Sequence, residues 1–389
     1  MVNAFVGGVV GVERSTLAPL AVHDFQLASK TAILSFLISF GLVKAAANLG
    51  AGWLADRAGR RTTLIAGWIA GLPVAPLILV APSWAWVVAA NVLLGINQGL
   101  AWSTTVNMKV DLVGPARRGL ALGLNEASGY LAVSAAAAAA GYLAATYGLR
   151  PTPFLLAEAL AVTGLLLSLL ARETSAHVEV ESGGGRRPGS LGELVRDVSL
   201  RNPTLSSACQ AGLVNNLNDA TAWALLPLYF GALGLGLREI GLLAGIYPAV
   251  WGGGQLITGW ISDQVGRKPL IVAGMLLQAA AMTGFVLPGG FAWWLVSSVA
   301  LGAGTALVYP TLLAVIGDAT PPVERATSIG VYRFWRDSGY AAGAIVAGVV
   351  ADAAGLRVAI LAVGGLTALS GIVVWVRMAS GLMAGGRSR

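Results

Sequence analysis

Long apolar runs alternate with short polar breaks along this chain of 389 residues. A helix needs about 20 apolar residues to cross the hydrocarbon core of a bilayer, and each run reaches that length. The runs therefore predict membrane-spanning helices. The predicted crossings are residues 2–21, 31–55, 62–81, 85–108, 118–146, 152–171, 204–231, 238–262, 269–288, 292–317, 325–351 and 356–379.

One long polar segment divides these crossings into two sets of six. Residues 172–203 contain a stretch rich in Gly, Arg and Pro, which is typical of a linker. The predicted fold is an all-α membrane protein with twelve transmembrane helices in two six-helix bundles. The bundles comprise residues 1–171 and 204–389, and residues 172–203 form a cytoplasmic linker.

Composition supports a membrane protein and excludes several other classes. Hydrophobic residues make up 56% of the chain and charged residues only 11%, whereas soluble domains carry about 25% charged residues. The net charge of +7 comes from basic residues in short loops, so it predicts membrane topology rather than nucleic-acid binding. One cysteine and two histidines cannot build a disulfide or a His/Cys metal site, so we expect neither metal nor cofactor.

The basic residues of the loops gather on one predicted face. This face holds Arg57, Arg60, Arg61, Arg117, Arg118, Arg186, Arg187, Arg267, Lys268 and Arg325, and the opposite face chiefly Arg150, Arg238 and Arg357. The positive-inside rule makes the first face cytoplasmic. We therefore expect a multi-pass protein of the plasma (inner) membrane with both termini in the cytoplasm.

An internal repeat relates the two sets of crossings. The stretch GWLADRAGRR begins at Gly52 and GWISDQVGRK begins at Gly259, an offset of 259 − 52 = 207 residues. The same offset pairs residues 111 and 318 (both Asp) and residues 118 and 325 (both Arg). Because each half has an even number of crossings, the halves have the same orientation. This predicts a parallel repeat about an axis along the membrane normal.

The repeated stretch resembles the signature of the major facilitator superfamily: Gly, three residues, Asp, a basic residue, one residue, Gly and two basic residues. The second copy has Gln264 where a basic residue is commoner. The resemblance extends over nearly the whole chain, since the motif occurs at symmetric positions among twelve crossings. It implies a monomeric secondary transporter that works by alternating access.

The resemblance also implies a cytoplasmic gate. Glycine permits tight turns, Asp can accept hydrogen bonds from a helix N-terminus, and the basic residues can pair with Asp at neighbouring helix ends. These charges could instead only orient the chain, but orientation needs neither an Asp nor a fixed Gly spacing. The predicted gate residues are Gly52, Asp56, Arg57, Gly59, Arg60, Arg61, Asp111, Arg118, Gly259, Asp263, Gly266, Arg267, Lys268, Asp318 and Arg325.

Charged residues also occur inside the predicted crossings. A charge at mid-bilayer costs about 2.5 kcal/mol or more, so it persists where it faces a cavity or a partner. We expect these residues, with nearby amides, to line a central cavity for substrate and coupling ion. In the alternative, the charges form structural ion pairs and the amides join helices. The predicted set is Glu13, Arg14, Lys44, Asn97, Gln98, Glu126, Asn215, Asp219, Arg333, Arg336 and Asp337.

The charges in this set balance four against four, so protonation of one carboxylate would leave the cavity positive. The prediction is a transporter of a small anionic or zwitterionic solute, coupled to protons through Glu13, Glu126 or Asp219. The alternative is a proton-driven multidrug or toxic-compound exporter. Gly95 stands where that family often has Arg, and the fifth crossing lacks the Gly-Pro-rich motif of drug–proton antiporters.

Three other classes fit the sequence poorly. An enzyme would need a nucleophile–base pair, metal ligands or an acidic cluster, and an ATP-driven pump would need a G-x-x-x-x-G-K-[ST] loop. A channel would more naturally have a lining that is uncharged or of one sign. The sequence does not distinguish import from export.

Overall fold

A computed structural model describes residues 1–113, 118–174, 191–321 and 324–379. Within these ranges the chain is helical and forms no strand. The N-terminal helices are α1 (Val2–His23), α2 (Lys30–Ala58), α3 (Arg60–Gly71), α4 (Val74–Leu79), α5 (Trp84–Asn97), the π-helix η1 (Gln98–Trp102), α6 (Ser103–Val113), α7 (Arg118–Tyr147) and α8 (Thr152–Leu169).

The helices after the polar segment repeat this pattern of long antiparallel elements. They are α10 (Leu191–Arg196), the π-helix η3 (Asp197–Arg201), α11 (Pro203–Ala220), the π-helix η4 (Thr221–Leu225), α12 (Leu226–Ala232), α13 (Leu237–Val265), α14 (Arg267–Val286), α15 (Gly290–Ala319), α16 (Arg325–Ala354) and α17 (Leu356–Arg377).

In the described part of the chain, ten helices are long and apolar enough to cross a membrane. Helical stretches also cover the remaining two predicted crossings. One is the continuous α11–η4–α12 segment, whose polar run contains residues 215–219, and the other is α16, which carries Arg333, Arg336 and Asp337. These polar side chains lower the hydropathy of both stretches, and they include five residues for which a function was predicted: Asn215, Asp219, Arg333, Arg336 and Asp337.

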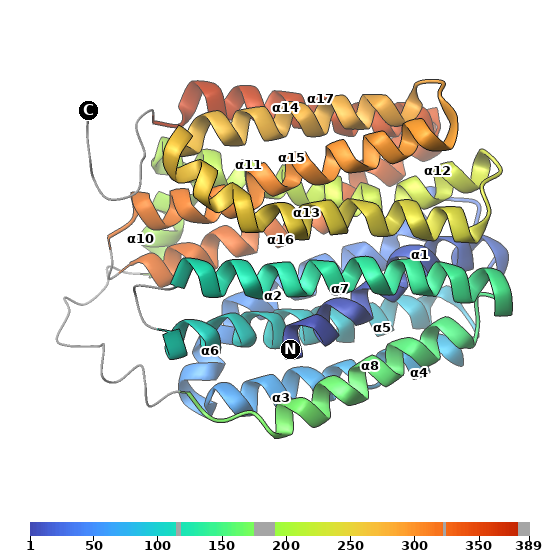
Figure 1. Cartoon of the computed structure of the whole chain (residues 1–389), viewed down its shortest axis with the longest axis horizontal. Helices are drawn as coiled ribbons and strands as arrows, with labels where there is room; N and C mark the ends of the chain where they lie inside the picture. Colours follow the sequence, from blue (N-terminus) through green and yellow to red (C-terminus); the bar gives the residue numbers. More distant parts are fainter. Residues whose placement is uncertain (114–117, 175–190, 322–323, 380–389) are drawn as a thin grey trace.

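The helices up to α8 pack together on one side of the molecule, and those from α11 onward pack on the other (Figure 1). We call these the N-terminal and C-terminal helices. Along their junction α2 lies against α16 and α7 against α13. Small residues allow this approach: a Cβ added at Gly141 would lie 2.6 Å from the Cα of Gly241. Close backbone approach at glycine is typical of helix pairs in membranes.

Two turns of equal geometry define one end of the molecule, at the left in Figure 1. Gly59 between α2 and α3 has φ +89°, and Gly266 between α13 and α14 has φ +95°. Residues with a Cβ rarely adopt such angles, so these turns favour glycine. We call this end the motif rim. The opposite end, where α2 begins and α16 ends, is the distal rim.

Candidate functional site

A narrow cavity lies between the N-terminal and C-terminal helices. Elements α2, η1, α6 and α7 form one wall, and α15 and α16 form the other. Its lining consists of Lys44, Asn48, Gln98, Trp102, Ser103, Tyr130, Tyr309, Arg333 and Arg336. It therefore joins residues that are far apart in sequence and belong to both groups of helices.

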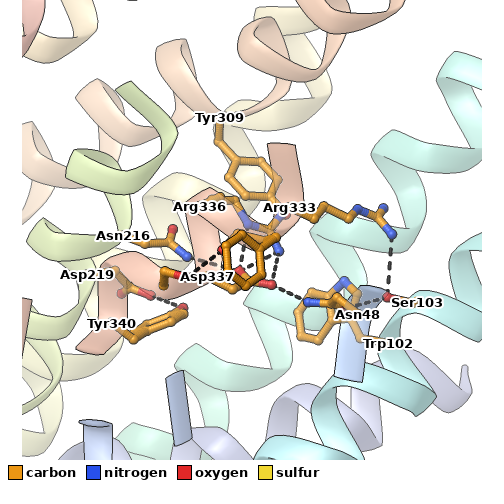
Figure 2. Close-up of polar contacts among 12 residues, drawn as sticks. Asn48, Trp102, Ser103, Asn216, Asp219, Tyr309, Arg333, Arg336, Asp337 and Tyr340 are labelled. Carbon is orange, nitrogen blue, oxygen red and sulfur yellow. Dashed lines mark hydrogen bonds and ion pairs between the residues drawn. The ribbon is translucent and has the colours of Figure 1, made fainter. Parts of the chain in front are cut away.

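Arg336 anchors the C-terminal wall of the cavity. Its Nε and Nη2 donate to the two oxygens of Asp337 at 2.7 and 2.9 Å, and its Nη1 donates to the hydroxyl of Tyr309 at 2.7 Å (Figure 2). Asp337 also accepts from the amide of Asn216 at 3.2 Å and from that of Asn48, on α2. Every oxygen of this carboxylate is thus occupied, and the contact with Asn48 connects α2 to α16.

Glu126, on α7, is held by two aromatic side chains of the lining. The hydroxyl of Tyr309 donates to Oε2 at 3.0 Å, and the indole N–H of Trp102 donates to Oε1 at 2.8 Å. Through Tyr309 the carboxylate is connected to Arg336. These bonds fix the two rings in place, and the Tyr309 bond connects α7 to α15.

Lys44 has no carboxylate partner among the described residues. Its ammonium group instead lies 5.4, 5.9 and 5.1 Å from the ring centroids of Phe40, Trp102 and Tyr340. A cation within about 6 Å of an aromatic face is attracted by the ring quadrupole, which replaces only part of the lost hydration. Lys44 is 8% exposed, so the charge is largely removed from water.

Arg333, on α16, lines the same cavity as Lys44. Its Nη1 donates to the hydroxyl of Ser103 at 3.4 Å, and its Nε has no hydrogen-bond partner in the described part of the chain (Figure 2). No described carboxylate lies within ion-pair distance of Arg333. Lys44 and Arg333 thus present two uncompensated cations to the cavity, one from each group of helices.

Arg14 and Asp219 form a separate buried ion pair between α1 and α11. The guanidinium donates to both carboxylate oxygens at 2.7 and 2.8 Å, and the hydroxyl of Tyr340 donates to the same carboxylate at 2.6 Å. The side chains are 3% and 0% exposed. Both residues were predicted to line the cavity. Neither belongs to the lining of this cavity, and each charge is neutralised by the other.

Glu13 lies outside the cavity lining and does not contact its neighbour Arg14. It is 2% exposed, and neither carboxyl oxygen has a hydrogen-bond partner in the described structure. Asn91 of α5 lies beside it, with its amide N–H donating to the carbonyl of Val87 and its Oδ1 unpartnered. The amide of Asn91 can donate to a charged Glu13 through its second N–H, and its Oδ1 can accept from a protonated Glu13, so this neighbour suits both protonation states.

The predicted amides mainly join helices. Asn97 donates to the carbonyl of Gly67 at 2.9 Å, and Asn215 accepts from Gln278 at 3.1 Å, so both bond to a neighbouring helix rather than line the cavity. Gln98 donates to the carbonyl of Val6 at 2.9 Å and also lines the cavity. For Asn97 and Asn215, the alternative of helix joining fits the geometry.

Some gate residues form a compact network at the motif rim. Arg267 contacts Asp318 at 3.1 Å and Asp263 at 2.6 Å, both within the C-terminal helices. In the N-terminal helices the carboxylate of Glu173 accepts the backbone N–H groups of Arg60 and Arg61 at 2.9 and 3.0 Å, which caps α3. Glu173 was not predicted, since it lies in a polar loop among several charges.

The other predicted gate residues are less defined. Gly52 and Gly259 lie near the ends of α2 and α13, Arg57 is exposed, and the ammonium of Lys268 lies 5.5 Å from the ring centroid of Trp375. Four predicted side chains lie outside the described part of the structure, as does Arg117. These four are Asp56, Asp111, Arg118 and Arg325.

A contact at the distal rim was also missed. Asp352, near the end of α16, accepts from the hydroxyl of Ser29 at 2.8 Å and from the backbone N–H groups of Lys30 and Thr31 at 2.5 and 3.0 Å. It thereby caps the N-terminus of α2 across the junction of the two groups of helices. A sequence signal exists: an acid in the last turn of a helix is unfavourable there and indicates a partner elsewhere.

The aromatic and small polar lining residues were missed as well. Trp102, Tyr130 and Tyr309 stand in apolar runs, where aromatic residues are ordinary packing groups. The repeat offset could have drawn attention to two of them, because 309 − 102 = 207. Residues 98–102 also form a π-helix, a local widening that is frequent at functional sites.

Comparison with known proteins identifies the family. The sequence model described as Major Facilitator Superfamily matches residues 4–215 and, a second time, residues 208–381. The chain belongs to the major facilitator superfamily. Its proteins are membrane transporters, so the predicted resemblance and the predicted transport class are confirmed.

Two relatives match most of the chain. The chain is 25% identical to the multidrug resistance protein MdtG of Citrobacter koseri over 378 residues, covering 92% of this chain and 88% of that protein. It shares 25% identity with MdtG of Salmonella arizonae, covering 92% and 89% of the two chains.

Solved structures of the superfamily share the fold. The nucleoside transporter NupG superposes with a TM-score of 0.76 at 12% identity, covering 97% of this chain and 98% of NupG. The xylose transporter XylE from E. coli gives 0.73 at 16% identity, covering 96% and 95%. The human organic anion transporter MFSD10 gives 0.69 at 18% identity, covering 96% and 98%. At these identities the likeness concerns the fold alone.

Proposed function

We propose that this superfamily member is a secondary active transporter of a small organic anion, coupled to protons and working by alternating access. In this proposal the helical stretches make twelve crossings in two six-helix halves. The repeat offset supports the division into two equivalent halves. Trp102 and Tyr309 occupy equivalent positions in the repeat, and both line one cavity. The observation that carries the proposal is the pair of uncompensated cations, Lys44 and Arg333.

The charge of the site favours an anion. Lys44, Arg333 and Arg336 contribute three positive charges, and Asp337 and Glu126 contribute two negative charges, so the formal sum is 3 − 2 = +1. A buried charge without a partner is costly, and an anionic ligand supplies the missing partner. Both oxygens of Glu126 already accept hydrogen bonds, which leaves little for a ligand cation.

The cavity is narrow, which favours a small solute over the drug-sized ligands that fill pockets of about 300–1,000 Å³. The lining comes from both halves, so a bound solute contacts each of them. Alternating access then requires the two halves to rock about this site.

Contacts at the distal rim indicate which side is closed. Asp352 joins α16 to α2 there, and Gly141 and Gly241 are in close contact farther along the junction. We assign the motif rim to the cytoplasm because it carries most of the loop arginines. In this assignment the structure is closed toward the outside, and both termini are cytoplasmic.

Removing either uncompensated cation should weaken anion binding. A hydrogen bond to a charged group contributes about 1.5–3 kcal/mol, so Lys44→Met or Arg333→Gln should each lower anion affinity about 10- to 150-fold. Uptake of radiolabelled organic anions into proteoliposomes, with and without a pH gradient, measures this change. The matched controls are Lys30→Met and Arg238→Gln, which remove a half-buried cation and an exposed cation at the distal rim. Affinities within twofold of the wild type in both cavity variants would contradict an anion site.

A second candidate is proton-driven export of several toxic compounds. It is favoured by the 25% identity to MdtG, a protein named for multidrug resistance, over 92% of this chain. Efflux of a lipophilic cation from loaded vesicles distinguishes the two proposals. The net positive cavity predicts that such a cation is moved no faster than by empty vesicles.

Asp352→Asn should loosen the distal rim. Loss of a charged helix cap costs about 1 kcal/mol, so the ratio of outside-closed to outside-open molecules should fall about fivefold. Spin labels at Tyr147→Cys and Leu233→Cys in a Cys209→Ser background would report a larger population of long distances across this rim. The control is Asp24→Asn, which removes an acid that pairs at 2.8 Å with Arg150 of the same half. An unchanged distance distribution in Asp352→Asn would show that this cap does not bias the equilibrium.

A further inference from the structure

We infer that the transported anion is aromatic, a small planar monocarboxylate whose ring lies against an aromatic wall of the cavity. This inference rests on the proposed function, because it names the substrate class of the same site. Three features carry it: the arrangement of the rings, the net charge, and the positions of the two free cations.

Three rings of the lining form a continuous wall. The ring centroids of Trp102 and Tyr130 are 5.2 Å apart, and those of Tyr130 and Tyr309 are 5.9 Å apart. Trp251 lies behind Tyr130, with centroids 3.6 Å apart. Neighbouring aromatic rings at such distances favour offset or edge-to-face packing with a further ring.

The wall is held rigid before any ligand arrives. Trp102 and Tyr309 are both hydrogen-bonded to Glu126, and Tyr309 also accepts from Arg336. Rings that are fixed in advance lose little side-chain entropy on binding. The faces of these fixed rings suit a ligand with a flat apolar surface.

Lys44 and Arg333 determine where the carboxylate of the ligand binds. Lys44 lies on α2, with its ammonium 5.9 Å from the Trp102 ring centroid, and Arg333 reaches from α16 to Ser103, the residue next to Trp102. A carboxylate between these two cations therefore has the aromatic wall directly beside it. The formal charge of +1 is cancelled by one carboxylate, whereas a dianion would leave the site negative.

The same geometry connects binding to the transport cycle. Lys44, Trp102 and Tyr130 belong to the N-terminal helices, whereas Arg333 and Tyr309 belong to the C-terminal helices. Without a ligand, the two uncompensated cations repel across the junction. A carboxylate between them replaces that repulsion by attraction to both halves, so the ligand has a different interaction energy in the open and closed arrangements.

Four compounds test whether the site binds aromatic monocarboxylates. Calorimetric titration of the purified full-length protein in detergent should compare benzoate with cyclohexanecarboxylate, phthalate and benzylammonium. Benzoate should bind about 2- to 12-fold more tightly than cyclohexanecarboxylate, which is the range that an aromatic pair contributes. Phthalate should bind more weakly than benzoate, and benzylammonium should not bind.

Two substitutions of Trp102 test whether this ring causes the preference for benzoate over cyclohexanecarboxylate. Trp102→Leu should bring benzoate and cyclohexanecarboxylate to equal affinity, whereas Trp102→Phe should keep the preference because it retains a ring and loses only the bond to Glu126. Monodispersity in size-exclusion chromatography and an unchanged unfolding temperature show that each variant is folded.

The outcomes separate this inference from the proposed function. Equal affinity for benzoate and cyclohexanecarboxylate in the wild-type protein would overturn the aromatic class and leave an anion transporter intact. Loss of the preference in Trp102→Phe would assign it to the Glu126 hydrogen bond and overturn the aromatic wall. If phthalate bound as tightly as benzoate, the inference that the site prefers a monocarboxylate would be wrong. Failure of both monocarboxylates, with binding of benzylammonium, would contradict the proposed function itself.

Discussion

Asp219→Ala should lower the free energy of unfolding by about 3–5 kcal/mol, because it leaves the guanidinium of Arg14 buried without a counter-charge. The side chain of Arg14 is 3% exposed and donates both of its ion-pair hydrogen bonds to this one carboxylate. Tyr340 also loses its acceptor. Thermal unfolding in detergent, followed by loss of the monodisperse peak, measures the effect.

A double substitution separates the stability of this pair from any part in transport. Replacing both partners by apolar residues of similar volume is often neutral, so Arg14→Met with Asp219→Leu should recover most of the lost stability. If the pair only fixes the packing of α1 against α11, this variant and the swap of Arg14→Asp with Asp219→Arg should also transport. A stable double variant that does not transport would show instead that the charges take part in the cycle. The control is Asp24→Ala, which breaks an ion pair that is 25–30% exposed and should cost less than about 1 kcal/mol.

The helices and the family could be predicted because the bilayer restricts what a sequence can form. Only helices and closed barrels satisfy backbone hydrogen bonds in lipid, so apolar length alone indicates the crossings. The motif beginning at Gly52 and its copy at Gly259 then indicated the superfamily. The crossing predicted at 62–81 is divided into α3 and α4 near Pro73, because proline lacks the N–H that a continuous helix would use there.

The cavity could be predicted only in part. Lys44, Arg333 and Arg336 were found because charges inside crossings are rare and need a reason. Trp102 and Tyr130 carry no such signal, since an aromatic residue suits lipid, core and cavity equally. Their role depends on which helix face meets the other half, and that is a property of tertiary packing.

The misplacement of Glu13 has a simple geometric cause. Consecutive residues of an α-helix point about 100° apart, so Glu13 and Arg14 cannot face the same neighbour. Arg14 faces α11 and meets Asp219, whereas Glu13 faces α5 and meets Asn91. Depth in the membrane was predicted for both residues, but the direction of each side chain was not.

Glu13→Gln should abolish proton-driven accumulation while sparing exchange of the anion. Glutamine supplies permanently the N–H that a protonated Glu13 supplies to Asn91, so the variant should fold normally and complete the substrate-loaded part of the cycle. It cannot release a proton, however, so the step that depends on release should stop. A gradient of one pH unit is worth about 1.4 kcal/mol and drives up to about tenfold accumulation for one coupled proton. The variant should reach only equal concentrations on both sides.

Two further acids provide the comparison that makes this test decisive. Glu158→Gln is the matched control, because it changes a partly exposed glutamate of α8 in the same half and should leave accumulation intact. Glu126→Gln should mainly alter anion affinity, since Glu126 accepts from Tyr309 and Trp102 at the cavity wall. Accumulation and counterflow of a radiolabelled anion, measured in the same proteoliposomes, report the two activities separately. Normal accumulation by Glu13→Gln would transfer the coupling role to Glu126 or Asp219. If Glu13→Gln, Glu126→Gln and Asp219→Asn all accumulate the anion normally, none of these carboxyl groups carries the coupled proton.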